Sequence, residues 1–286
     1  MTLNDRIKQD LTELYLNGEI TTAHDLSVNM FGVSDAFAAH GMPGHFCGNR
    51  QARTVMVMLN PGKDVSKANN PICTHAYLSK LSIDTSSVAN FIDTYKKGSK
   101  DYGHIDKHRL DNFDIKQAAF LKHWENCGVD IAKEFPMNTE DAIRESVKEN
   151  VLTQKLQLEL VPYASRSFET IKDKCILELL FPFVETLFDE IFSCKREYVI
   201  FCSDYFDTLF REYDKNNNIR FDKKQGIALF SKGRKAYCTP IKICYGSDSI
   251  KAVIAHTFPN QALPNAYAKM EQYGKFCYGV FKGSAI

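Results

Sequence analysis

Five strand-like segments that alternate with helical segments constrain the fold of this chain more than any other feature. Each is a short apolar run bounded by turn-forming residues, the pattern that indicates a buried strand. They cover residues 54–59, 156–161, 198–202, 236–245 (broken near Pro240) and 252–256. Strands joined through helices need crossover connections, which favour a parallel sheet with helices on both faces. We therefore predict an α/β fold, a three-layer sandwich around a central, mostly parallel sheet.

The 286 residues are enough for one large domain or two small ones, and no clean linker divides them. We predict a single domain over residues 1–286. It begins with a helical segment at residues 1–40. A mostly helical insertion follows the first strand and covers residues 65–150.

Three further features predict local structure. Pro182 interrupts a strongly helical run, which predicts a kink or a split into two helices. Gly274 stands near the end of the last helical pattern and predicts its C-terminus. The polar residues 96–114 predict a loop within the insertion.

Composition excludes several classes of protein. The net charge is +1, so no strong overall field attracts a polyanion, although a local basic patch remains compatible with it. The nine cysteines include no C-x-x-C pair, which predicts reduced thiols and neither a metal site nor a cofactor. The N-terminus lacks the apolar core of a signal peptide, and no apolar run approaches about 20 residues. We expect a monomer in a reducing cytoplasm, with no membrane partner.

Polar and turn-forming residues follow the first and the last predicted strand. The stretch "TVMVMLNPGKDV" ends a buried strand on Asn60-Pro61-Gly62, and the last strand leads into His256 and "TFPNQALPN". Ligands of parallel sheets bind at the carboxyl ends of the strands. We therefore expect Asn60 and His256 to lie on one edge of the sheet.

The order of these motifs resembles the uracil-DNA glycosylase superfamily. Residues 59–62, "LNPG", are similar to the catalytic loop of its mismatch-specific branch, and "HTFPNQAL" is similar to the His-containing loop that follows the family's last strand. The family often has "HPSPLS" in that loop and Asn where this chain has Glu159. The resemblance implies a monofunctional DNA glycosylase. Such an enzyme hydrolyses the N-glycosidic bond of a base flipped from double-stranded DNA and leaves an abasic site.

The resemblance implies three catalytic residues, each of which has a structural alternative. The amide of Asn60 would position water against the anomeric carbon, although Asn before Pro also opens turns. Asp64 is the nearest carboxylate and would assist, or it is an exposed loop acid. His256 would donate a hydrogen bond to the departing base, or it is a satisfied core histidine.

Glu159 bears on the identity of the base. A carboxylate accepts a hydrogen bond from the amine of a cytosine-type base. Alternatively, Leu158 and Leu160 fill the buried face of the strand and Glu159 turns to solvent. Excision of plain cytosine would destroy the host genome, so we expect a modified cytosine and a role in defence against phage DNA. Three aromatic residues are candidates to stack on the base, or belong to the core: Tyr163, Tyr77 and Phe46.

DNA contacts are predicted from two groups of residues. Phe258 or Leu263 would wedge into the duplex, and Arg166 and Ser165 would contact phosphates. Residues 211–251 hold ten basic and four acidic residues, a net +6, which indicates either a phosphate-binding arm or a solvated hairpin. The residues singled out in this segment are Lys232, Arg234 and Lys235. Two other functions remain open: a non-catalytic nucleic-acid-binding or protein-binding member of the fold, and a nucleoside or nucleotide hydrolase.

Overall fold

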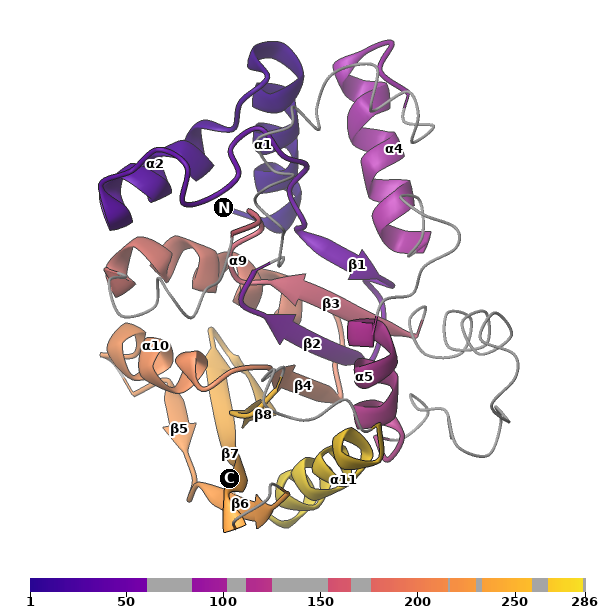
Figure 1. Cartoon of the computed structure of the whole chain (residues 1–286), viewed down its shortest axis with the longest axis vertical. Helices are drawn as coiled ribbons and strands as arrows, with labels where there is room; N and C mark the ends of the chain where they lie inside the picture. The colour runs from indigo at the N-terminus through magenta and orange to yellow at the C-terminus, as the bar shows by residue number, and fades with distance from the viewer. Residues whose placement is uncertain are drawn as a thin grey trace. The chain divides into compact units, whose positions relative to one another are not determined.

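The computed structural model describes residues 1–60, 84–101, 112–124, 154–165, 176–215, 217–229, 233–258 and 267–284. The chain has an α/β fold whose strands form one mixed sheet, in the order β1-β3-β2-β4-β8-β7-β5, with β6 paired to β7 (Figure 1). The strands are β1 (Phe46–Gly48), β2 (Thr54–Met58), β3 (Lys155–Glu159), β4 (Tyr198–Phe201), β5 (Ile219–Phe221), β6 (Gln225–Ala228), β7 (Lys235–Tyr245) and β8 (Asp248–Ala255).

All five predicted strands are present, but one of them has an unexpected direction. β4 pairs in parallel with β2 and with β8, whereas β7 pairs antiparallel with β5, β6 and β8. The turn between β7 and β8 is short, since Tyr245 pairs with Asp248, and Gly246 adopts φ 61° there. A parallel pair needs a crossover of a dozen residues or more. A turn as short as this one therefore allows only the antiparallel arrangement.

Pro240 does not break β7, contrary to our prediction. It lies opposite the gap between β5 and β6, and its carbonyl accepts a hydrogen bond from the backbone N–H of Asp222 at 2.9 Å. Its ring nitrogen faces the same gap, where no ladder hydrogen bond is required. The three strands that we did not predict, β1, β5 and β6, are only three or four residues long.

The contacts divide the chain into two compact units. Unit 1 comprises Met1–Cys47, Met58–Ile105 and Leu158–Ser193, and unit 2 comprises Gly48–Val57, Asp106–Gln157 and Cys194–Ile286. The helices of unit 1 are α1 (Leu3–Asn17), α2 (Thr21–Phe31), α4 (Val88–Asp101), the 3-10 helix η3 (Leu177–Leu180) and α9 (Phe181–Phe192). Those of unit 2 are α5 (Asn112–Leu121), α10 (Tyr205–Tyr213) and α11 (Tyr267–Gly283).

Local sequence accounts for the helix boundaries in unit 1. Thr2 and Asp5 form a capping box at the start of α1, and Gly18 ends the helix at φ 72°. Pro182 lies in the first turn of α9, directly after η3, so the change of helix type falls next to the proline at which we predicted a kink or a split. α4 packs beside α1 and continues to Asp101, so the start of the predicted loop is helical (Figure 1).

In unit 2, helices cover both faces of β4. Tyr198 packs against Trp124 beyond α5 and Phe281 of α11, with ring centroids 5.6 Å apart in each pair. Phe201 faces the other way and packs against Phe206 and Phe210 of α10. Because successive residues of a strand point to opposite faces, these contacts place the two helical layers on opposite sides of the strand.

Gly274 lies in the middle of α11 and does not end it, which corrects our prediction. A Cβ atom at this position would stand 1.8 Å from the backbone oxygen of Phe120 in α5. The glycine therefore allows two helices to approach closely. The described parts of residues 65–150 contain α4 and α5. No helix in the described ranges is long and apolar enough to cross a membrane.

Candidate functional site

His256 follows β8 directly, at the edge of the sheet where β4 also ends. These two strands are parallel neighbours, so Ser203 and Asp204 after β4 lie on the same edge as His256. The backbone N–H of His256 donates to the carbonyl of Tyr237 at 3.1 Å. Its Nε2 lies 2.7 Å from Oγ1 of the buried Thr239, and its buried Nδ1 has no hydrogen-bond partner among the described residues.

The imidazole of His256 is neutral at pH 7. Burial is the main cause and lowers its pKa to about 4, and the positive charge of Lys224 acts in the same direction. Asp207 and Asp204 of the α10 region oppose this shift, while Arg211 reinforces it. Arg211 is itself paired with Asp207 at 3.1 Å. A neutral imidazole still carries one N–H, so His256 can donate a hydrogen bond without bringing a positive charge.

Asn60 is the first residue beyond the paired part of β2. Backbone hydrogen bonds continue the β2–β3 ladder as far as Leu59 and Val161. The Nδ2 of Asn60 then donates to the carbonyl of Tyr163 at 3.2 Å and to Oγ of Ser165 at 2.8 Å. A carbonyl only accepts hydrogen bonds, so this contact fixes which end of the amide faces the Tyr163 segment. These two contacts orient the amide, whereas the turn that we gave as an alternative begins at Pro61, outside the described residues.

The Tyr163 segment also contacts a buried polar cluster, which no sequence motif predicts. The hydroxyl of Tyr163 donates to Oδ2 of Asp10 at 2.8 Å. The same carboxylate oxygen lies 3.1 Å from Nε2 of His45, within ion-pair range although the two atoms are not aligned for a hydrogen bond. Both side chains are fully buried. Burial, opposed by Asp10, lowers the pKa of His45. The cluster ties α1 to the residues that hold Asn60.

Glu159 ends β3 on the half-buried face of the strand. Leu158 and Leu160 are buried, so the predicted alternation is present. The face of Glu159 does not simply meet solvent, however, because Lys155 on the same face is completely buried. Its Nζ donates to Oε1 of Gln117 in α5 and, at 3.2 Å, to Oε1 of Gln157. Glu159 is thus the last residue of a polar row on one face of β3.

Four predicted contacts with DNA or its bases belong to buried side chains. Tyr163 is buried with its hydroxyl on Asp10, and Phe46 packs against Tyr95 at 6.4 Å. Phe258 is buried against Phe120 at 5.2 Å, and Ser165 is buried with its hydroxyl on Asn60. None of the four presents a surface to a base or a phosphate in this structure. For Tyr163 and Phe46 the core alternative is therefore favoured, and the burial of Phe258 does not fit the predicted wedge into the duplex.

The remaining predicted residues divide into two groups. Arg234 and Lys235 are exposed, at the start of β7. Five others lie outside the described residues: Asp64, Tyr77, Arg166, Lys232 and Leu263.

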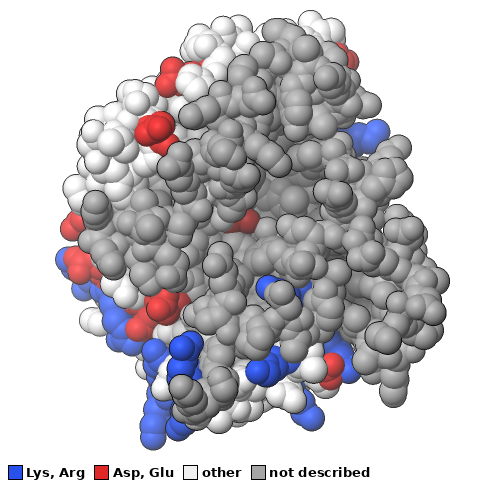
Figure 2. All heavy atoms as spheres, viewed as in Figure 1, with Lys and Arg blue, Asp and Glu red and all other residues white. Residues whose placement is uncertain are grey.

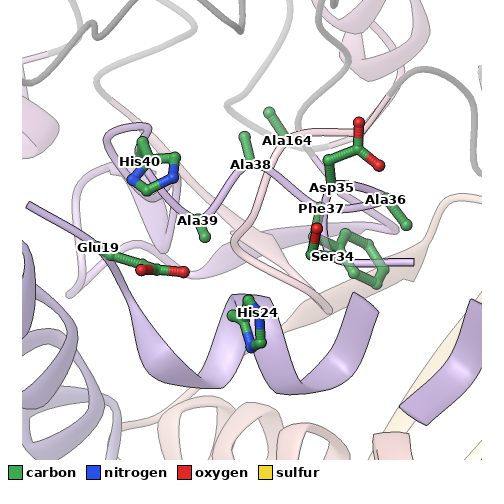
Figure 3. Close-up of a pocket in the computed structure, with 10 residues that line it drawn as sticks. All are labelled: Glu19, His24, Ser34, Asp35, Ala36, Phe37, Ala38, Ala39, His40 and Ala164. Carbon is green, nitrogen blue, oxygen red and sulfur yellow. The ribbon is translucent and has the colours of Figure 1, made fainter. Parts of the chain in front are cut away.

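A cavity of about 350 Å³ opens in unit 1 and is lined by residues between 19 and 40 together with Ala164 (Figure 3). Its lining combines small apolar residues with polar side chains: Glu19, His24, Ser34, Asp35, Ala36, Phe37, Ala38, Ala39, His40 and Ala164. Nδ1 of His40 donates to the carbonyl of Gly18 at 2.9 Å. No set of three or more His, Cys, Asp or Glu residues in the described ranges is placed to hold a metal ion.

No family model matches this sequence, and no curated protein does either. The resemblance to the uracil-DNA glycosylase superfamily accordingly rests on the chain's own motifs.

Proposed function

We propose that this chain is a monofunctional DNA glycosylase that hydrolyses the N-glycosidic bond of a flipped base and leaves an abasic site. One observation supports the proposal most directly. His256 stands at the carboxyl end of a parallel strand as a neutral imidazole, held through Nε2 by Thr239 and with Nδ1 buried. When the Thr239 hydroxyl donates to Nε2, the single N–H of the ring is on Nδ1. Because Nδ1 is buried in this structure, the proposal requires it to be uncovered before it can bind the departing base. Such a donor is worth about 2.7–4 kcal/mol in the transition state.

Asn60 fits the second role in this reaction. Its Nδ2 donates hydrogen bonds to Tyr163 and Ser165. Its acceptor Oδ1 is therefore the atom that would orient a water molecule toward the anomeric carbon. An amide is not a general base. The catalytic effect must therefore come from stabilising the departing base and a sugar with oxocarbenium character. The proposal requires Asn60 and His256 to flank the same base, with Asp64 as the nearest carboxylate.

The proposal includes the finer description of fold and substrate. In it, the parallel strands β2, β4 and β8, together with β3, form a sheet of the uracil-DNA glycosylase type, and the antiparallel strands β5–β7 are added to it. Glu159 accepts a hydrogen bond from the amine of a cytosine that carries a substituent at its fifth carbon. The setting is a monomeric cytoplasmic enzyme that acts on modified phage DNA.

The test is an assay on matched duplexes that carry uracil, mismatched thymine, cytosine or a 5-substituted cytosine at one position. Heating in alkali breaks the strand at abasic sites, and mass spectrometry identifies the released base. We expect breaks in a modified-cytosine duplex. Asn60→Ala and His256→Ala should each abolish most of the excision while DNA binding persists, because each removes a transition-state interaction.

Three outcomes would contradict the proposal. DNA binding without release of any base would favour a non-catalytic binding protein. Release of base only from free nucleosides, added as a separate substrate, would favour a nucleoside hydrolase. Full turnover in both variants would place the chemistry elsewhere.

A further inference from the structure

Tyr237 is the only aromatic residue among the large apolar side chains that are exposed in the described part of the chain. Its exposed fraction is 39%, whereas the other members of this group are aliphatic. It lies on β7, inside the +6 segment of residues 211–251. A hairpin that is merely solvated needs only charged side chains to remain in contact with water. The exposed aromatic ring of Tyr237 has no such explanation.

The ring of Tyr237 lies close to Gly226 and to the side chains of two lysines. Gly226 of β6 pairs with Tyr237 of β7, and a Cβ atom at Gly226 would stand 2.8 Å from Cε1 of the ring and 3.3 Å from Cδ of Lys235. The Nζ of Lys224 lies 4.9 Å from the ring centroid. Both lysines are exposed. We call these four residues (Lys224, Gly226, Lys235 and Tyr237) the Tyr237 strip.

The Tyr237 strip is continuous with the surroundings of His256. The carbonyl of Tyr237 accepts the backbone N–H of His256, and Thr239, two residues further along the same side of β7, contacts the imidazole. Lys224 is also close enough to add to the effect of burial on the pKa of His256. In Figure 2, Lys and Arg side chains gather on the lower part of the face shown, in the region that β5, β6 and β7 occupy in Figure 1.

We propose that the Tyr237 strip binds the DNA strand next to the flipped nucleotide: the ring stacks on a neighbouring base, and Lys224 and Lys235 contact phosphates. This inference rests on the proposed function. Aromatic rings bind bases that are not stacked in a duplex, and such a base exists beside a flipped nucleotide. Lysine ammonium groups bind phosphates without regard to sequence. The combination suits a nucleic-acid strand better than an acidic peptide, because a peptide offers the charges but not the planar bases.

The test measures DNA binding apart from catalysis. Fluorescence anisotropy follows the full chain binding a fluorescein-labelled duplex with a central tetrahydrofuran, which mimics an abasic site, and an uninterrupted duplex of the same sequence. We expect Tyr237→Ser to weaken binding to the first duplex about tenfold, and Tyr237→Phe, which keeps the ring, to bind like the wild type. Gly226→Val should resemble Tyr237→Ser, since its side chain displaces the ring.

The lysines are tested through the dependence of binding on salt. Lys224→Gln and Lys235→Gln should each reduce the slope of log K against log salt concentration by about one unit. Lys8→Gln, the same change at an exposed position of α1, is the matched control and should leave the slope unchanged. Thermal unfolding of each variant confirms that it is folded.

Wild-type affinity in Tyr237→Ser would overturn the inference, as would an equal loss of affinity in Tyr237→Phe. Displacement of the labelled DNA by an acidic peptide at equal concentration would assign the strip to a protein partner. The two proposals fail in different ways. A wild type that excises a base but is insensitive to Tyr237→Ser contradicts the strip alone. A wild type that excises nothing, but whose DNA binding depends on Tyr237, contradicts the glycosylase alone.

Discussion

The side-chain nitrogen of Asn60 donates to the hydroxyl of Ser165 over 2.8 Å, and this bond joins the loop after β2 to the segment after β3. The predicted phosphate contact of Ser165 does not fit this structure, because the side chain is buried and its oxygen accepts from the amide of Asn60. Ser165 is therefore a positioning residue for Asn60 in the proposed reaction.

Replacing Ser165 by Ala should lower single-turnover excision by about two- to tenfold and leave DNA affinity unchanged, because it removes one hydrogen bond that orients the amide. In the Asn60→Ala background, the same change should have no further effect on the rate. The control is Ser193→Ala, which removes a hydroxyl whose one hydrogen bond among the described residues is to the carbonyl of Glu190. Additive losses in the double mutant would show that Ser165 acts independently of Asn60.

Thr239→Val should also slow excision, by about tenfold, because it removes the hydroxyl that holds Nε2 of His256 while keeping the shape of the side chain. In a proton NMR spectrum the tautomer of His256 should become mixed. An unchanged rate together with a changed tautomer would mean that the orientation of this imidazole does not matter for the reaction.

Acid should destabilise the protein partly through His256. Its folded pKa, about 4, lies below its usual 6.5, so the unfolded state binds more protons between these two values and stability rises with pH across that window. We expect the free energy of unfolding in urea to fall from pH 7 to pH 4.5 more steeply in the wild type than in His256→Asn. His45, whose pKa is also lowered, acts in the same direction in both proteins and cancels from the comparison. Parallel pH dependences would show that His256 titrates normally in the folded state.

Glu159→Gln should change which base is excised. The carboxylate accepts from an amine and repels a carbonyl oxygen, whereas an amide can also donate, so the variant should lose about 1–3 kcal/mol of preference for cytosine-type bases over uracil. The measurement is the ratio of kcat/KM on matched duplexes. Efficient excision of uracil by the wild type, or the same ratio in the variant, would remove Glu159 from base recognition.

Gly274→Ala and Gly279→Ala form a matched pair within α11. The first places a Cβ atom 1.8 Å from the backbone oxygen of Phe120 and should destabilise the fold by about 1–3 kcal/mol, because α5 must move. The second meets no atom within 4 Å and should stabilise by up to about 1 kcal/mol through helix propensity. Thermal and urea unfolding of both variants measure the difference. Equal effects would show that α5 and α11 do not pack closely in solution.

The strands were predictable from the sequence because their apolar runs are local. The direction of β7 was not, since it depends on the short turn at Gly246, and the short strands β5 and β6 carry too few apolar residues to stand out. Gly274 was misread because a glycine that ends a helix and one that admits a neighbouring helix look the same in sequence. Its true partner, Phe120, lies far away along the chain.

The candidate site was likewise predictable only in part. Asn60 and His256 follow recognisable strands, so their places at strand ends were predictable, although the bonds that hold them were not. Asp10 belongs to no motif, and only the fold brings it to Tyr163. Tyr237 was not predictable from the charges of the basic segment, because its exposed ring lies opposite Gly226 and that pairing is set by the register of two strands.

The bond between Asp10 and Tyr163 gives the first helix an importance that no motif reveals. A fragment of this protein that starts after Asn17 would retain every residue named in the glycosylase resemblance. It would nevertheless lack the carboxylate of Asp10, which accepts a hydrogen bond from the hydroxyl of Tyr163. The carbonyl of Tyr163 is in turn one of the two acceptors for the side chain of Asn60. A fragment designed to keep the contacts of Asn60 should therefore begin before α1, well ahead of the first motif.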